Sequence, residues 1–159
     1  MSEDKSILLS HIQLIALECE GVEKTLANLP KFGRLKQDET GLAYLDIDDA
    51  YISKTYDLIK DRANIPAYFG EEPSFIGAHI SVFYPNENVI LAPHDINVDH
   101  HFEIVGLFEA EISDMKIYAL KVKASSLTDL RYHYNLPEKL SYKGCLVDFH
   151  ITVGTKILR

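Results

Sequence analysis

The sequence has 159 residues, of which 47% are hydrophobic and 25% charged. This composition suits one compact domain with its own core and excludes an intrinsically disordered chain. The formal net charge of −8 argues against a broad basic surface for long duplex or single-stranded nucleic acid, but it is compatible with a small phosphorylated ligand in one local pocket.

The start of the sequence and its cysteines indicate a cytoplasmic protein. MSEDKS has no basic region followed by an apolar one, as a secretory signal would have. No apolar run approaches the ~20 residues that span a bilayer. Cys19 and Cys145 are typical of reduced, buried thiols. We therefore expect a single domain over residues 1–159 that does not associate with membranes.

The first third of the chain alternates short apolar and polar segments. His11 lies at the start of this region and is given no functional role. The pattern predicts a strand near 11–18, a helix over 21–29 that ends before Pro30, a polar connection over 31–40 and a short strand over 42–47.

An amphipathic helix is predicted over 50–62, because its apolar residues fall near one face. Its start is marked by an acidic N-cap and its end by residues that break helices: Asp48 or Asp49, then Asn64, Pro66 and Gly70. The loop 66–74 that follows carries two adjacent aromatics, Tyr68 and Phe69. Such rings can stack on a nucleic-acid base or cover the core as a hydrophobic flap, and both interpretations stay open.

Residues 85–101 form a polar connection between the two halves of the chain. The segment is rich in side chains that can bind metals: His94, Asp95, Asp99, His100 and His101. His100 and His101 are neighbours, however, and point apart on an extended backbone. Their spacing matches no common ligand signature, so a solvated loop is the preferred interpretation and no metal site is predicted.

The second half shows clearer periodicity. Residues 102–112 and 116–123 alternate between apolar and polar, and Ser113-Asp114 between them suits a tight turn, so we predict a hairpin. The remaining elements are a helix over 127–134, capped by Ser125 or Ser126 with Asp129 completing a capping box and ended by Pro137, then a loop over 138–144 and a final strand that the tail KILR can continue.

Two strand-like stretches share one pattern. FIGAHISVFY, residues 75–84, and LVDFHITVG, residues 146–154, each contain His, Ile, a hydroxyl residue and Val in succession. Side chains alternate faces along a strand, so each His points to the same side as the hydroxyl two residues later. The paired residues are His79 with Ser81, and His150 with Thr152. The following Ile and Val are predicted to face the core.

The surroundings of the two stretches repeat as well. An Asn-apolar-Pro segment ends 13 residues ahead of each His, at Pro66 and at Pro137, and the two histidines lie 71 residues apart. A helical segment with Asp-Leu precedes each copy. Two units are too few for a solenoid, so the repeat predicts a pseudo-twofold pair of lobes, roughly 1–85 and 102–159, whose strands can interleave.

Two imidazoles that face each other across a cleft can act as general base and general acid in one step, because their unperturbed pKa lies near ~6.5. Phosphoryl chemistry suits them, since the entering and leaving oxygens lie roughly in line on opposite sides of phosphorus. Ser81 and Thr152 would donate hydrogen bonds to the remaining oxygens. This scheme needs no metal and no cofactor.

Other active-site types fit less well. A Ser-His-Asp hydrolase is disfavoured because Ser81 and Thr152 follow a His on the same strand and no Gly-x-Ser-x-Gly elbow is present. The sequence also has no Gly-rich phosphate loop of the Walker or dinucleotide type.

The doubled His-x-Ser/Thr-x motif, with apolar residues at both x positions, resembles the 2H phosphoesterase superfamily, which includes RNA ligase-like 2′,3′-cyclic phosphodiesterases. The resemblance implies a two-lobed α+β fold whose antiparallel sheets enclose a central cleft, with helices outside. It further implies that His79 and His150 are the catalytic acid–base pair and that Ser81 and Thr152 bind phosphate. The first motif has Ser where many members have Thr, a chemically mild departure.

The leading hypothesis is a monomeric, metal-independent phosphodiesterase that opens a 2′,3′-cyclic phosphate or a related nucleotide or RNA-end ester. The acidic net charge favours a mononucleotide, a short oligonucleotide or an ADP-ribose-derived cyclic phosphate over long RNA. A non-catalytic nucleotide- or RNA-end-binding module is the alternative, and an interaction domain with structural histidines is a third reading. Candidate additional substrate contacts are Tyr68, Phe69, Tyr84, Arg131 and Lys156.

Overall fold

The computed structural model describes residues 14–17, 21–63, 65–66, 76–112, 114–142 and 144–158. In chain order, the elements are β1 (Leu14–Leu17), α2 (Val22–Leu26), β2 (Phe32–Gln37), β3 (Ala43–Asp46), α3 (Ala50–Ile59), β4 (Ile65–Pro66), β5 (His79–Phe83), η1 (Pro85–Glu87), η2 (Pro93–Asp95), β6 (Asp99–His101), β7 (Glu103–Ile112), β8 (Met115–Lys123), α4 (Ser125–His133), β9 (Leu140–Tyr142), β10 (Cys145–Val147) and β11 (His150–Ile157).

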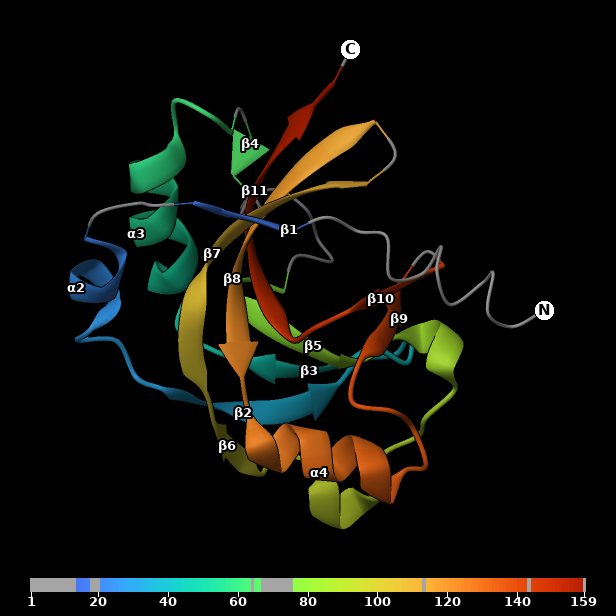
Figure 1. The fold of residues 1–159 in the computed structure, drawn as a ribbon. Helices are drawn as coiled ribbons and strands as arrows, with labels where there is room; N and C mark the ends of the chain where they lie inside the picture. The colour runs from blue at the N-terminus through green and yellow to red at the C-terminus, as the bar shows by residue number, and fades with distance from the viewer. Residues whose placement is uncertain are drawn as a thin grey trace.

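The strands form two larger antiparallel sheets and one short ribbon. One sheet has the order β1-β7-β8-β11-β4, the other β5-β3-β2-β6, and β9 pairs with β10. The sheets mix the two halves of the sequence, because β1 and β4 join the sheet of β7, β8 and β11 (Figure 1). The architecture is a two-lobed α+β fold, which confirms the predicted fold class.

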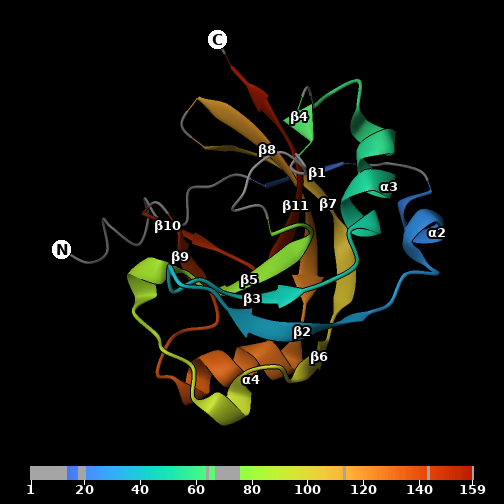
Figure 2. The same cartoon turned by 180° about the vertical axis from the view of Figure 1, so that it is seen from behind.

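The helices lie outside the sheets. Figures 1 and 2 show α2 and α3 together on one side of the molecule and α4 below the sheet of β2, β3 and β5. Helix α3 packs on β11, and α4 contacts β5 and β6. The amphipathic pattern predicted for 50–62 is present: Tyr51, Ile52, Thr55 and Ile59 are the buried residues of α3. No helix within the described ranges is long and apolar enough to cross a membrane.

Several predicted boundaries are confirmed. The hairpin of β7 and β8 extends from Glu103 opposite Lys123 to Ile112 opposite Met115, with one shift of register between Ile104 and Gly106. Strand β3 falls inside 42–47, and β11 continues into the tail as far as Ile157. The strand expected near 11–18 is present over Leu14–Leu17, whereas His11 and Cys19 lie outside the described residues.

Other predictions were wrong. Residues 31–40 are not a simple polar connection, because Phe32–Gln37 is a strand in which buried Gly33 and Leu35 alternate with exposed residues. The loop expected over 138–144 contains β9. The first residues of the second motif stretch belong to a separate strand, β10, and β11 begins only at His150. Helix α4 has Ala124 at its N-cap with no side-chain capping bond, so the predicted Ser caps and capping box do not form.

Candidate active site

The two motif strands are brought together at the centre of the molecule. β5 lies in one sheet and β11 in the other, and the two strands are in contact. Their burial alternates as predicted: Ile80 and Val82 on β5, like Ile151 and Val153 on β11, are completely buried. The His and hydroxyl residues are part-exposed on the opposite face. Each strand therefore anchors its motif in the core through the residues between the polar ones.

All four motif side chains line one cleft of about 270 Å³. His79 and Ser81 reach it from β5, and His150 and Thr152 reach it from β11. Residues from other parts of the chain complete the wall: Thr40, Leu42, Tyr84, Pro85, Ile117 and Tyr142. If the two histidines were unrelated structural residues, they would not be expected to line the same cleft. Their shared cleft therefore favours a functional pair.

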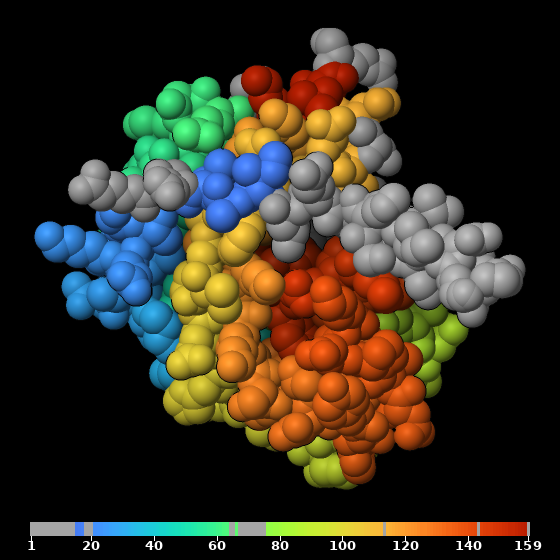
Figure 3. Space-filling view, viewed as in Figure 1, coloured from blue at the N-terminus to red at the C-terminus, as the bar shows by residue number. Residues whose placement is uncertain are grey.

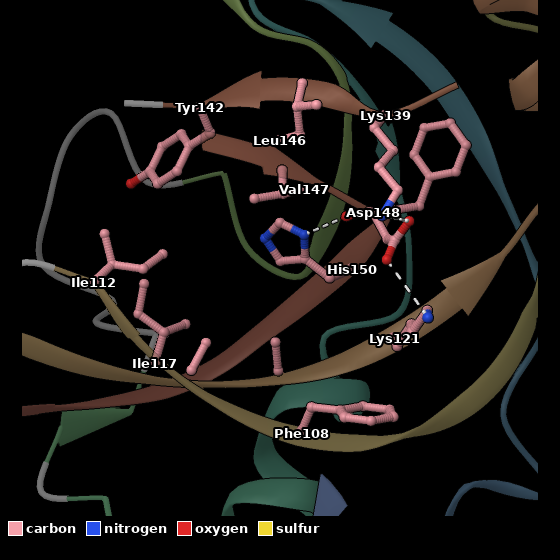
Figure 4. Close-up of a pocket in the computed structure, with 13 residues that line it drawn as sticks. Phe108, Ile112, Ile117, Lys121, Lys139, Tyr142, Leu146, Val147, Asp148 and His150 are labelled. Atoms are coloured by element: carbon pink, nitrogen blue, oxygen red, sulfur yellow. Dashed lines mark hydrogen bonds and ion pairs between the residues drawn. The ribbon is translucent and has the colours of Figure 1, made fainter. Parts of the chain in front are cut away.

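Both imidazoles are held by the same local hydrogen bond. Nδ1 of His79 lies 2.8 Å from the backbone oxygen of Gly77. Nδ1 of His150 lies 2.7 Å from the backbone oxygen of Asp148, the contact that Figure 4 shows. A carbonyl can only accept, so Nδ1 carries the hydrogen and Nε2 is the nitrogen left for proton exchange. In each copy the acceptor is the backbone oxygen two residues before the His, just ahead of the strand. The two copies therefore also share the same imidazole tautomer.

The electrostatic environment keeps His150 neutral over a wider pH range than usual. Burial lowers the pKa of His150 below its ordinary value of 6.5, and the nearby His79 acts in the same direction. The hydrogen bond to the carbonyl of Asp148 partly opposes this lowering of the pKa. Both rings line the same cleft, so a positive charge on His79 disfavours a second one on His150.

Tyr84 also lies at the cleft, immediately after β5. Burial raises the pKa of its phenol to about 12, so it is a neutral hydrogen-bonding group at physiological pH. The nearby Ser81 side chain partly opposes this rise of the pKa, and the Tyr84 ring lies 5.0 Å from that of Tyr142 between centroids. Of the candidate additional contacts, Tyr84 is therefore placed beside the motif residues.

The structure does not bring Arg131 or Lys156 to the cleft. Arg131 is completely buried, and its guanidinium binds Glu87 and three backbone oxygens, so it has a structural role in place of the expected substrate contact. Lys156 lies on β11 opposite Lys116 and is not among the residues that line the cleft. Tyr68 and Phe69 fall outside the described residues.

Several residues at the site leave little signal in the sequence pattern. Tyr142 reaches the cleft from β9, a strand that was expected to be a loop. Gly77 and Asp148 matter through their backbone oxygens, which leave no side-chain signature. Their shared position two residues before a His is the one signal that could have drawn attention to them.

The polar segment between the two halves is tied to its neighbours rather than to a common centre. His100 Nδ1 lies 2.8 Å from the hydroxyl of Ser126, and Asp99 binds Arg34. Asp95 accepts a hydrogen bond from the hydroxyl of Tyr134. Over the ranges that the structure describes, no three His, Cys, Asp or Glu side chains are grouped so as to hold a metal ion.

Comparisons with known proteins place the chain in a family. No curated protein and no solved structure matches the chain. Residues 43–158, well over half of the sequence, match a protein family described as the Swiss Army Knife 2H phosphoesterase domain, 2H-SAK. The matched region contains both motif strands and both imidazoles of the cleft. The chain therefore belongs to the 2H phosphoesterase superfamily.

Proposed function

We propose that the protein is a metal-independent phosphodiesterase that opens a 2′,3′-cyclic phosphate or a related nucleotide or RNA-end phosphodiester. The observation that carries the proposal is the pair of imidazoles whose Nδ1 atoms are fixed by carbonyls while both rings line one cleft. Phosphodiester hydrolysis needs one group to remove a proton from water and another to supply a proton to the departing oxygen.

In the proposed reaction, one imidazole accepts a proton from the attacking water through Nε2. The new oxygen–phosphorus bond forms as the opposite ester bond breaks, and the second imidazole donates its proton to the leaving oxygen. The hydroxyls of Ser81 and Thr152 donate hydrogen bonds to the non-bridging oxygens, where negative charge accumulates. The products are a phosphomonoester and the free hydroxyl.

The acidic net charge favours a small substrate. With a formal charge of −8, the chain has no excess of cations to neutralise a long phosphate backbone. A mononucleotide, a short oligonucleotide or an ADP-ribose-derived cyclic phosphate presents one or two phosphates to a cleft of this size. We propose that a monomer acts on such small ligands in the cytoplasm.

The test is hydrolysis of nucleoside 2′,3′-cyclic phosphates and short 2′–5′ linked oligonucleotides in EDTA by the wild type, His79→Ala and His150→Ala. We expect turnover to survive chelation and to fall by several orders of magnitude in each variant, because each acid–base role contributes ~10²–10⁴. Binding without turnover, retained in His→Gln variants, would support the non-catalytic module. Equal rates in wild type and both variants would contradict the catalytic assignment.

A further inference from the structure

A second hollow adjoins the two-histidine cleft. It has a volume of about 250 Å³ and lies between the hairpin of β7 and β8 and the ribbon of β9 and β10. Figure 3 shows the surface hollowed between these yellow-orange and red-orange segments. The hollow, here called the apolar groove, is lined by Phe108, Ala110, Ile112, Ile117, Ala119, Lys121, Lys139, Tyr142, Leu146, Val147, Asp148, Phe149 and His150.

The apolar groove and the two-histidine cleft are continuous. Three residues line both: Ile117, Tyr142 and His150. In Figure 4 the ring of His150 turns one nitrogen toward the carbonyl of Asp148 and the other toward the side that carries Ile112, Ile117 and Tyr142. A phosphorus atom within reach of His150 therefore lies at the mouth of the groove, and one of its substituents can extend into it.

The lining indicates what kind of substituent fits. The end of the groove that His150 faces carries four aliphatic side chains and one phenol: Ile112, Ile117, Leu146, Val147 and Tyr142. The charged side chains gather at the other end, where Asp148 pairs with Lys121 at 3.5 Å and with Lys139 at 3.6 Å. A nucleobase at this end would meet one phenol and otherwise aliphatic side chains, so most of its amide-like donors and acceptors would lack partners, which costs free energy.

The volume sets the size of the occupant. A cavity of about 150 Å³ accepts benzene, so a groove of about 250 Å³ admits a group larger than one aromatic ring. Thr40, Tyr84 and Pro85 line the cleft but not the groove, so the second substituent of the same phosphorus can lie against them.

We infer that the apolar groove binds an alkyl or aryl ester group of the substrate, so that the protein acts on phosphodiesters with one apolar substituent next to the reacting phosphorus. The inference rests on the proposed phosphodiesterase function and adds to its substrate class phosphodiesters whose second ester group is apolar. The small cyclic phosphates used to test that function would leave the groove empty.

The test measures dissociation constants of inorganic phosphate and of methyl, butyl and hexyl phosphate by calorimetry. We expect the constant to fall about fourfold for each methylene that the groove buries. Ile112→Ser and Leu146→Ser, which remove aliphatic surface on different elements, should flatten this dependence without weakening the binding of inorganic phosphate. Ile90→Ser, at a position that is 87% exposed, is the control and should behave as the wild type.

Three outcomes would overturn the inference. Equal affinity for all chain lengths would show that the groove does not bind the ester group. Tighter binding of adenosine 2′-phosphate than of hexyl phosphate, lost in the groove variants, would assign the groove to a nucleobase. Binding of hexanol as tight as that of hexyl phosphate would separate the groove from the phosphate site. Failure of this inference would leave the proposed phosphodiesterase function intact, because hydrolysis of cyclic phosphates does not use the groove.

Discussion

The hydroxyls of Ser81 and Thr152 are the proposed donors to the phosphate, one from each strand. Removing one preorganised donor to a developing oxyanion costs ~10²–10³ in kcat, so Ser81→Ala and Thr152→Ala should each lower kcat about 10²-fold in the hydrolysis assay. Thr55→Val is the matched control, because the Thr55 hydroxyl is buried in α3 away from the cleft and has no hydrogen-bond partner among the described residues. Full activity in either alanine variant would contradict its assigned role.

His150 couples folding stability to pH. Burial, followed by the nearby His79, lowers the pKa of folded His150 below the ordinary 6.5, so the unfolded chain binds more protons between the two values. The free energy of unfolding therefore rises with pH between the folded pKa and 6.5. As pH falls from 6.5 toward the folded pKa, the protein loses the part of its stability that depends on neutral His150. Urea midpoints measured across the window should decline toward acid in the wild type and decline less in His150→Gln.

The control for this pH dependence is the comparison of the wild type with His150→Gln, because both proteins keep His100. Burial also lowers the pKa of His100, which works in the same direction, so the informative quantity is the difference between the wild type and His150→Gln. Identical slopes for the two proteins would show that His150 is as easily protonated in the folded state as in the unfolded chain.

At the scale of the element, the turn into β5 depends on Gly77. Its φ is +91°, a Cβ there would lie 2.5 Å from Oδ1 of Asp49, and that oxygen accepts the amide of Ala78. Because the carbonyl of Gly77 also holds His79, Gly77→Ala should lower both the melting temperature and kcat. Gly21→Ala is the control, since Gly21 has the same φ with open space around it and should lose only the ~1–2 kcal/mol of left-handed strain. Equal losses of stability and activity in both variants would argue against a specific role for the turn.

The elements that sequence reasoning found differ physically from those it missed. β7 and β8 alternate over ten and nine residues, and α3 repeats its apolar face over ten, so local pattern alone identifies them. β6, β9 and β10 have three residues each, too few to show a period. In β2 one of the two buried positions is Gly33, which has no side chain to mark the inward face in the sequence. Only glycine fits there, because a Cβ would clash with the backbone oxygen of Asp46. Such strands are specified by their partners more than by their own residues.

At the scale of the whole molecule, the motif placed four side chains correctly in one cleft, but the walls around them depend on long-range pairing. Ile117 comes from β8 and Tyr142 from β9, and each reaches the cleft only because of the strands that it pairs with. The sequence repeat likewise does not reveal that β4 pairs with β11 across the two halves. A short motif identifies the proposed reacting groups, whereas the surfaces that would select a substrate form only through long-range strand pairing.

Arg131 joins the separate parts of this assembly. From α4, its guanidinium donates to the backbone oxygen of Val82 on β5 at 2.6 Å, to that of Lys139 ahead of β9 at 2.9 Å, and to Glu87 of η1 at 2.7 Å. The Arg131 side chain is completely buried and that of Glu87 is 5% exposed. The pair thus fixes the back of the β5 motif strand and the segment that follows Tyr84.

Breaking this pair should therefore cost far more than breaking an exposed one. Removing one member of a buried ion pair costs ~3–5 kcal/mol, because the other charge is left without a partner, so Arg131→Met should markedly lower the urea midpoint. Arg131→Met combined with Glu87→Leu should recover part of that loss, since no buried charge remains. Arg34→Met is the control, because the Arg34–Asp99 pair is about half exposed and such pairs contribute ~0–1 kcal/mol. If Arg131→Met lowered the urea midpoint no more than Arg34→Met does, the buried pair would contribute no more to stability than the exposed one.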